Sequence, residues 1–85
     1  MNAAVTTVFG TGAGLRGAVY SPLAGGTYGF ARVDRVGFRP AAGGSTSYPS
    51  PITDTRGVDL AADNTTMLVV GPANGTWLIA RVPLG

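Results

Sequence analysis

The fold is decided by one stretch near the end of the 85-residue chain, residues 66–82, which reads TMLVVGPANGTWLIARV. Two apolar runs of strand length lie on either side of five residues that contain a proline and end in Asn74-Gly75. Asn-Gly is the dipeptide that most readily adopts the positive φ angles of a tight turn, and β-branched and aromatic residues favour strands. The stretch therefore predicts a β-hairpin.

The predicted hairpin is apolar on both faces. Along its second run, one face carries only aliphatic residues, and the other carries Trp77, Ile79 and Arg81. Runs that are apolar at successive positions are typical of strands with a dry environment on both sides. Trp77 is then either part of the core or, with Ile79 and Arg81, an anchor in an interface with another protein.

Composition indicates an all-β protein. The chain contains no Glu, Gln, Lys, His or Cys, and 14 of its residues are Gly. Most good helix formers are therefore absent, whereas Val and Thr, which favour strands, are abundant. We expect a single domain over residues 1–85, with about five to seven short antiparallel strands in a small barrel or sandwich.

The chain has few means of stabilising so small a fold. A domain of this size buries only about 60–70% of the surface that its unfolded chain exposes. The absence of Cys and His removes disulfides and the commonest metal ligand. We therefore expect its stability to come from packing or from association with other chains.

Further strands are expected at residues 4–9, 15–20 and 58–60, each of which is apolar and bounded by turn-forming residues. Residues 27–38 alternate in character but are interrupted at Asp34-Arg35. This pattern predicts one long strand with a kink or bulge near Asp34, and a tight turn between two short strands is the alternative.

The middle of the chain, about residues 39–57, is rich in Gly, Pro and Ser and is expected to form an extended loop or arm. Structureless segments of that length are uncommon inside compact domains and are usually functional, disordered or laid along a partner. Tyr48 is a large side chain within this segment, and we expect it to anchor the arm on a partner.

Catalytic side chains are scarce. The usual general bases and nucleophiles His, Cys, Lys and Glu are absent, so no Ser or Thr has a His or Lys to activate it. The four Asp residues stand in no recognisable catalytic or metal-binding motif. We therefore expect no enzymatic activity, no cofactor and no metal site.

One glycine motif has the spacing of a dinucleotide-binding fingerprint. Residues 12–17 read GAGLRG after a strand-like run, and Asp34 follows roughly 20 residues later. The fingerprint works only where a helix begins at the motif, so that its N-terminal amides meet a pyrophosphate. Pro22 and β-branched residues occupy the positions of that helix, so we interpret the motif as a glycine connector.

Arginines and aromatic residues are interleaved in the first half of the chain. Three arginines lie close in sequence among Tyr28, Phe30 and Phe38. Such a mixture of guanidinium groups and stacking faces resembles the surfaces with which small barrels bind single-stranded nucleic acid. The alternative is that the aromatic residues form the core and the arginines flank them. The residues considered for contact with a partner are Arg32, Arg35, Arg39, Tyr48, Trp77, Ile79 and Arg81.

In overall character the chain resembles the small head or tail proteins of bacteriophages that infect GC-rich actinobacteria. The resemblance lies in its small size, Lys-free composition, glycine-rich β pattern and extended arm. It implies a non-enzymatic structural subunit, such as a capsid decoration (cement) protein or a head or tail protein, that acts through protein–protein contacts. A small β-barrel that binds nucleic acid through the arginine and aromatic residues is the alternative.

The expected partners are capsid or tail subunits or further copies of the chain itself, with nucleic acid as the alternative partner. The first residues lack the pattern of a secretory signal, and no apolar stretch approaches the ~20 residues that cross a bilayer. We therefore expect a soluble protein with no membrane partner, made in the host cytoplasm and located in the virion, or otherwise cytoplasmic.

Overall fold

The computed structural model describes residues 4–85 and shows an all-β protein with two antiparallel sheets and, within these residues, no helix. The all-β prediction is therefore confirmed. The seven strands are β1 (Leu15–Ser21), β2 (Thr27–Arg32), β3 (Arg35–Arg39), β4 (Thr46–Pro49), β5 (Gly57–Leu60), β6 (Thr66–Ala73) and β7 (Thr76–Pro83).

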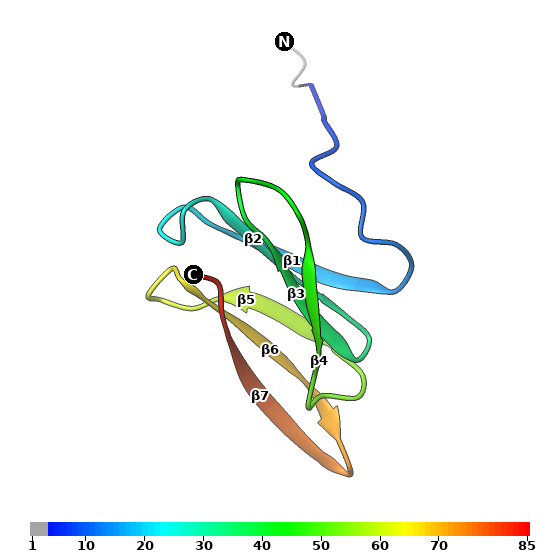
Figure 1. The fold of residues 1–85 in the computed structure, drawn as a ribbon. Coiled ribbons are helices and arrows are strands. Elements are labelled where there is room, and N and C mark those ends of the chain that lie inside the picture. Colours follow the sequence, from blue (N-terminus) through cyan, green and yellow to red (C-terminus); the bar gives the residue numbers. More distant parts are fainter. Residues whose placement is uncertain (1–3) are drawn as a thin grey trace.

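The strands follow one another in space as they do in sequence. The first sheet has the order β1-β2-β3-β4 and the second has the order β5-β6-β7 (Figure 1). The sheets are not closed into a barrel, so the finer prediction of a barrel or sandwich is not confirmed. Strands β4 and β7 each end a sheet, and the chain crosses from one sheet to the other between β4 and β5.

The predicted hairpin is β6 and β7, and its turn is tighter than expected. Asn74 and Gly75 both have positive φ, 49° and 80°, and only these two residues separate the strands. Pro72 is therefore part of β6 and pairs with Trp77. Its carbonyl accepts a hydrogen bond from the Thr53 N–H, on the side away from β7, so its missing N–H removes no bond between the two hairpin strands.

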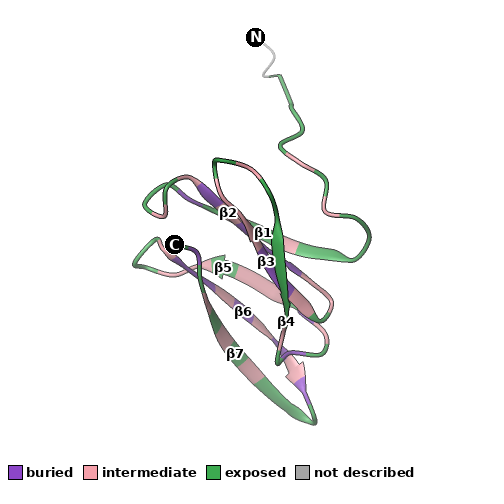
Figure 2. Cartoon of the chain, viewed as in Figure 1, coloured by how far each residue is buried: buried purple, intermediate pink, exposed green. Residues whose placement is uncertain are grey.

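The core lies between the two sheets, where their buried residues meet (Figure 2). The inner face of β6 contributes Met67 and Val69, which are almost completely inaccessible. Ile52, from the crossover between the sheets, is also fully buried. The buried cluster consists of Ala31, Val36, Ile52, Met67, Val69 and Leu84.

The segment predicted as a loop or arm, residues 39–57, contains strand β4 and ends in a fixed crossover. Thr55 is fully buried, and its backbone N–H donates to the carbonyl of Val33 at 2.8 Å. The Ser50 N–H donates to the carbonyl of Asp34 at 2.9 Å. These long-range bonds, together with the burial of Ile52, tie the second half of the segment to the body of the protein.

Residues 27–38 form two strands, β2 and β3, joined by a turn at Val33-Asp34, so the prediction of one long strand is wrong and the alternative is confirmed. The Val33 and Asp34 carbonyls are held by the crossover segment, which stabilises the turn. The turn also changes which residues share a face. Phe38 pairs with Gly29 and therefore lies on the opposite face from Tyr28 and Phe30.

The strand predicted at residues 4–9 is absent. These residues belong to no sheet, and the N-terminal end of the described chain extends away from the two sheets (Figure 1). Val5 is 98% exposed. An alternating sequence is necessary for a half-buried strand, but without a partner strand it does not form one.

Asp63 organises the turn that leads into β6. Its Oδ1 accepts hydrogen bonds from the backbone N–H groups of Thr65 (2.9 Å) and Thr66 (3.0 Å), and its Oδ2 accepts one from Thr66 Oγ1 (2.9 Å). The bond from the Thr65 N–H and those from Thr66 hold the pKa of Asp63 below its ordinary value. The ionised carboxylate is thus the form that the folded chain prefers.

This preference predicts a pH dependence of stability. The pKa of Asp63 is lower in the folded than in the unfolded chain, so its contribution is present above the unfolded value of about 4 and is lost as pH falls through the folded value. Asp63→Asn should therefore lower Tm at neutral pH and weaken the fall of Tm in acid. Thermal unfolding followed by circular dichroism from pH 7 to about pH 3 tests this. Asp34→Asn, at an exposed carboxylate, is the control, and an equal acid response in wild type and Asp63→Asn would contradict the assignment.

Candidate protein-interaction site

The predicted arginine and aromatic cluster lies on the outer face of the first sheet, where the chain covers it with its own N-terminal segment. Tyr28, Phe30 and Arg39 point to the same side of β2 and β3. The Phe9 ring packs edge-on against Tyr28 and Phe30, with centroid distances of 5.7 and 5.9 Å. The Arg39 guanidinium lies 5.1 Å from the centre of the Phe9 ring. Phe30 is consequently buried.

The other two arginines of this cluster are also engaged within the chain. Arg32 donates from Nε and Nη2 to the carbonyl oxygen of Ala13, at 3.0 and 2.7 Å. Arg35 donates from Nη2 to the carbonyl and the hydroxyl of Ser47, both at 3.3 Å. Stacking faces and guanidinium groups that already have partners are poorly placed to bind a nucleic acid strand.

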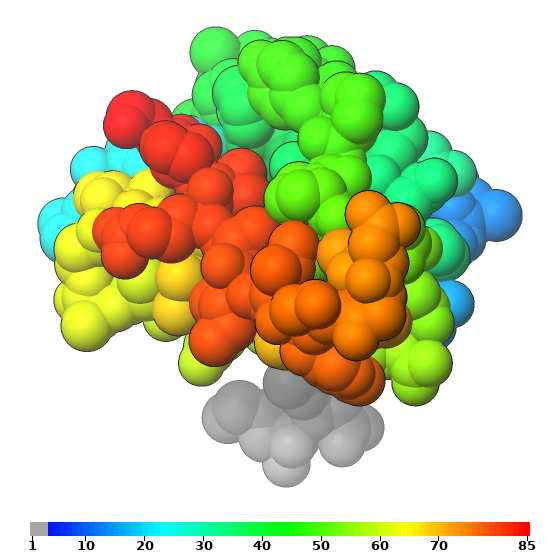
Figure 3. Space-filling model, turned by 90° about the horizontal axis from the view of Figure 1, so that it is seen from below, coloured from blue at the N-terminus to red at the C-terminus, as the bar shows by residue number. Residues whose placement is uncertain are grey.

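The outer face of the second sheet is apolar, and the described residues leave it open. Val70 of β6 pairs with Ile79 of β7, and Pro72 pairs with Trp77, so all four point to the same side together with Leu68. Trp77 is 61% exposed and Ile79 is 74% exposed. Figure 3 views the molecule from the side of this hairpin, whose residues (orange to red) form a broad part of the surface.

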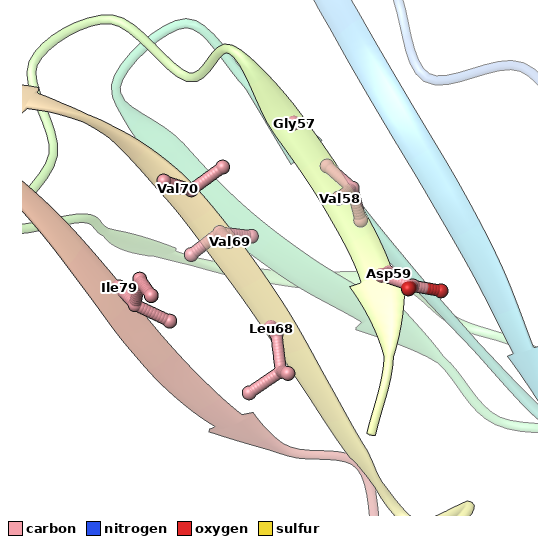
Figure 4. A pocket seen from close by; sticks show the side chains of 7 residues that line it. All are labelled: Gly57, Val58, Asp59, Leu68, Val69, Val70 and Ile79. Atoms are coloured by element: carbon pink, nitrogen blue, oxygen red, sulfur yellow. The ribbon is translucent and has the colours of Figure 1, made fainter. Parts of the chain in front are cut away.

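A hollow of about 370 Å³ lies on this sheet, and Figure 4 shows the side chains around it. Gly57 of β5 pairs with Val70, whose Cγ1 leans so far over it that a Cβ on Gly57 would lie only 3.0 Å from that methyl. Ile79 stands on the other side of β6. The lining residues are Gly57, Val58, Asp59, Leu68, Val69, Val70 and Ile79.

Opposite charges stand at the two sides of the open face. Asp59 of β5 pairs with Leu68 of β6, and Leu68 pairs with Arg81 of β7, so one row across the sheet reads acidic, apolar, basic. Both charged residues are exposed. Arg81 lies 3.7 Å from Asp63, a long and exposed ion pair that contributes little to stability. We call the whole surface the Trp77 face: it consists of Gly57, Asp59, Leu68, Val70, Pro72, Trp77, Ile79 and Arg81.

The structure brings some of the predicted contact residues together and separates others. Trp77, Ile79 and Arg81 share the Trp77 face, as their alternation along the sequence indicates. The three arginines lie on the first sheet. Tyr48 lies there too, half-exposed on β4, with its ring 5.9 Å from that of Phe38.

Sequence reasoning missed the contribution of β5 to the Trp77 face. Gly57 and Asp59 reach it only through the pairing of β5 with β6. Leu68 and Val70 were part of the predicted hairpin, and a two-residue turn at Asn74-Gly75 would have given their register with β7. The two-residue turn at Asn74-Gly75 was therefore the sequence signal for Leu68 and Val70, whereas no local signal indicated that β5 pairs with β6.

The described residues supply no evidence for other chemistry. The motif at residues 12–17 runs into strand β1 and not into a helix, so the helix N-terminus that a dinucleotide needs is absent from that place. No group of His, Cys, Asp or Glu within residues 4–85 could hold a metal ion. In the same residues, no helix has the length and apolar character needed to span a membrane.

Comparison of the chain with models of protein families, with curated proteins and with solved structures finds no match among any of the three. The Trp77 face is therefore interpreted from its own geometry.

The engagement of the arginines predicts little affinity for nucleic acid. We expect no measurable binding of a fluorescent single-stranded DNA oligonucleotide by anisotropy at low salt, where electrostatic binding is strongest. Binding that weakens steeply with salt and is lost in the combined variant Arg32→Gln/Arg35→Gln/Arg39→Gln would instead support a nucleic-acid site on the first sheet. Arg81→Gln, on the second sheet, is the matched control.

Proposed function

We propose that this chain is a non-enzymatic subunit of a larger protein assembly and that it joins a neighbouring protein through the Trp77 face. The observation that carries the proposal is the exposure of Trp77 and Ile79 next to Leu68 and Val70 on one face of the sheet. Large contiguous apolar patches are rare on monomeric proteins and usually mark interaction sites.

The composition of the face is that of a protein interface. Interfaces combine an apolar centre with a polar rim and are enriched in Trp and Arg. Val70 and Ile79 form such a centre, whereas Asp59 and Arg81 stand at its two sides. Trp77 is the type of side chain that most often dominates binding energy when a partner buries it.

The described residues cover the outer face of the first sheet but not that of the second, and this difference also supports the proposal. On the first sheet the chain supplies its own cover, because Phe9 packs on Tyr28 and Phe30. On the second sheet the aromatic and aliphatic side chains of the Trp77 face have no such cover among residues 4–85. A partner protein would supply it.

For the assembly itself we propose the head or tail of a bacteriophage, in keeping with the small size and Lys-free, glycine-rich composition of the chain. Subunits of such shells contact several neighbours. Exposed apolar side chains also occur away from the Trp77 face, at Val5 in the N-terminal segment and at Tyr48 on the edge strand β4. Exposed edge strands and extended segments are surfaces that add readily to a neighbouring subunit.

The proposal predicts that Trp77→Ala impairs assembly more than folding. Bacteriophage particles are assembled with wild-type or variant chain and purified on a density gradient. Quantitative mass spectrometry then counts the copies of this chain per particle. Loss of a dominant anchor costs about 2 kcal/mol or more, which corresponds to roughly 30-fold weaker binding.

The control for this experiment is Leu23→Ala, which truncates another exposed apolar side chain, 68% accessible and located in the turn between β1 and β2 of the first sheet. Thermal unfolding of the isolated chains shows whether either variant alters the fold. The proposed function is wrong if Trp77→Ala occupies particles as well as wild type does, or if no particle ever contains the chain.

A further inference from the structure

We infer that the Trp77 face binds a second copy of this chain, related to the first by a two-fold axis that runs parallel to β6. The inference rests on the proposed function, in that it takes the Trp77 face as a protein interface, and it names the partner. Two features of the three strands carry the inference: the positions of the charged residues and the position of the hollow. Under this rotation, each acidic position of one copy meets a basic position of the other, and each hollow meets a protruding side chain.

The charged residues of the face do not pair with each other within the chain. Asp59 and Arg81 lie in one row but on the two outer strands, with Leu68 between them. Two strand spacings, about 10 Å, separate their backbones, and no ion pair joins them; Arg81 lies instead 3.7 Å from Asp63, in a long and exposed ion pair. Within residues 4–85, Asp59 accepts only a local hydrogen bond, from the backbone N–H of Leu60 at 2.8 Å.

Two sheets that pack face to face keep their strands nearly aligned, which leaves two simple two-fold arrangements. With the axis across the strands, β5 lies over β5 of the partner and β7 lies over β7. Asp59 then faces either another Asp59 or an uncharged neighbour of it on β5, and Arg81 faces either another Arg81 or an uncharged neighbour of it on β7. Like charges in contact, or charges buried without a partner, are strongly unfavourable.

With the axis parallel to β6, strand β5 of each copy lies over β7 of the other. Asp59 of one copy then faces Arg81 of the other, and the symmetry makes this pair twice. Leu68 and Val70 of the two copies meet at the centre, because β6 lies on the axis. Of the two arrangements, only this one combines opposite charges at both sides with an apolar centre.

The hollow on the face is filled in the same arrangement. Gly57 and Ile79 share a row with Val70 between them, so the rotation places Ile79 of each copy over Gly57 of the other. Ile79 is 74% exposed in the single chain, and Gly57, which has no side chain of its own, lines the hollow together with Val70. A protruding side chain on β7 thus meets a hollow over β5, and again the fit occurs twice.

The test exchanges charges between the two positions. Asp59→Arg alone brings two arginines together at each side of the dimer, and Arg81→Asp alone brings two carboxylates together. Each variant should dimerise about 100-fold more weakly than wild type, because like charges in contact oppose binding. In an equal mixture, every Arg introduced at position 59 faces an Asp introduced at position 81, so a heterodimer should form. Sedimentation equilibrium of the two variants, separately and mixed, measures this.

Two further variants test the same arrangement by cross-linking, so that the conclusion does not depend on charge repulsion alone. The chain contains no Cys, so Asp59→Cys and Arg81→Cys each carry a single thiol. Facing sheets pack about 10 Å apart, which is too far for a disulfide but within the reach of a short bismaleimide cross-linker. Treatment of the mixture of the two variants with this reagent should give a linked pair that contains one chain of each, whereas Ser47→Cys, on the first sheet, should not link to either. Circular dichroism and thermal unfolding show whether each variant keeps the wild-type fold.

Wild-type dimers, weak self-association of each charge variant and recovery of the dimer in the mixture would support the inference. A wild-type chain that stays monomeric at all accessible concentrations would overturn it, and so would a dimer that the charge variants leave unchanged or that the mixture fails to restore. These results are separable from the particle experiment. If the chain is monomeric but Trp77→Ala still loses its place in the particle, the face binds a different protein and the proposed function stands.

Discussion

The hairpin β6–β7 carries apolar side chains on both faces, whereas the described chain packs extensively over one. Met67 and Val69 on its inner face are almost fully buried against the first sheet and the crossover. Much of the remaining chain follows from this contact: the crossover brings Ile52 into the core, and the segment after β7 adds Leu84. Because these residues pack on the inner face, few apolar side chains of the described chain are left to cover the outer face.

The first sheet shows what a covered outer face looks like in this protein. Phe9 reaches back from the N-terminal segment to Tyr28 and Phe30, and the carbonyl of Ala13 accepts two hydrogen bonds from Arg32. An arginine-rich and aromatic surface that reads as a binding site in the sequence is thereby satisfied within the chain. On the second sheet Trp77 and Ile79 remain exposed, and the difference between the two faces is the basis of the proposed function.

The sequence was informative where local chemistry decides the structure. Asn74-Gly75 identified the hairpin because few dipeptides adopt two successive positive φ angles, and the scarcity of helix formers identified the all-β class. Alternation was less informative, since it is the same for a strand that finds a partner and for one that does not. Residues 4–9 alternate but pair with nothing.

Long-range contacts account for the other differences. The turn at Val33-Asp34 is held by the N–H groups of Ser50, 16 residues after Asp34, and of Thr55, 22 residues after Val33, so no local pattern reveals it. The same is true of the Trp77 face. Its hairpin half could be derived from alternation, but Gly57 and Asp59 join it only because β5 pairs with β6.

The central claim is that another protein chain buries the Trp77 face and excludes water from it. The fluorescence of Trp77 can report this burial, because Trp77 is the single tryptophan of the chain. The decisive measurement is its fluorescence emission and its quenching by acrylamide, recorded over the protein concentrations in which sedimentation follows the mass of the chain. We expect the emission to shift to the blue and the quenching to fall together with the rise in mass. A rise in mass with unchanged emission and quenching would show that association uses another surface, and this would contradict the account.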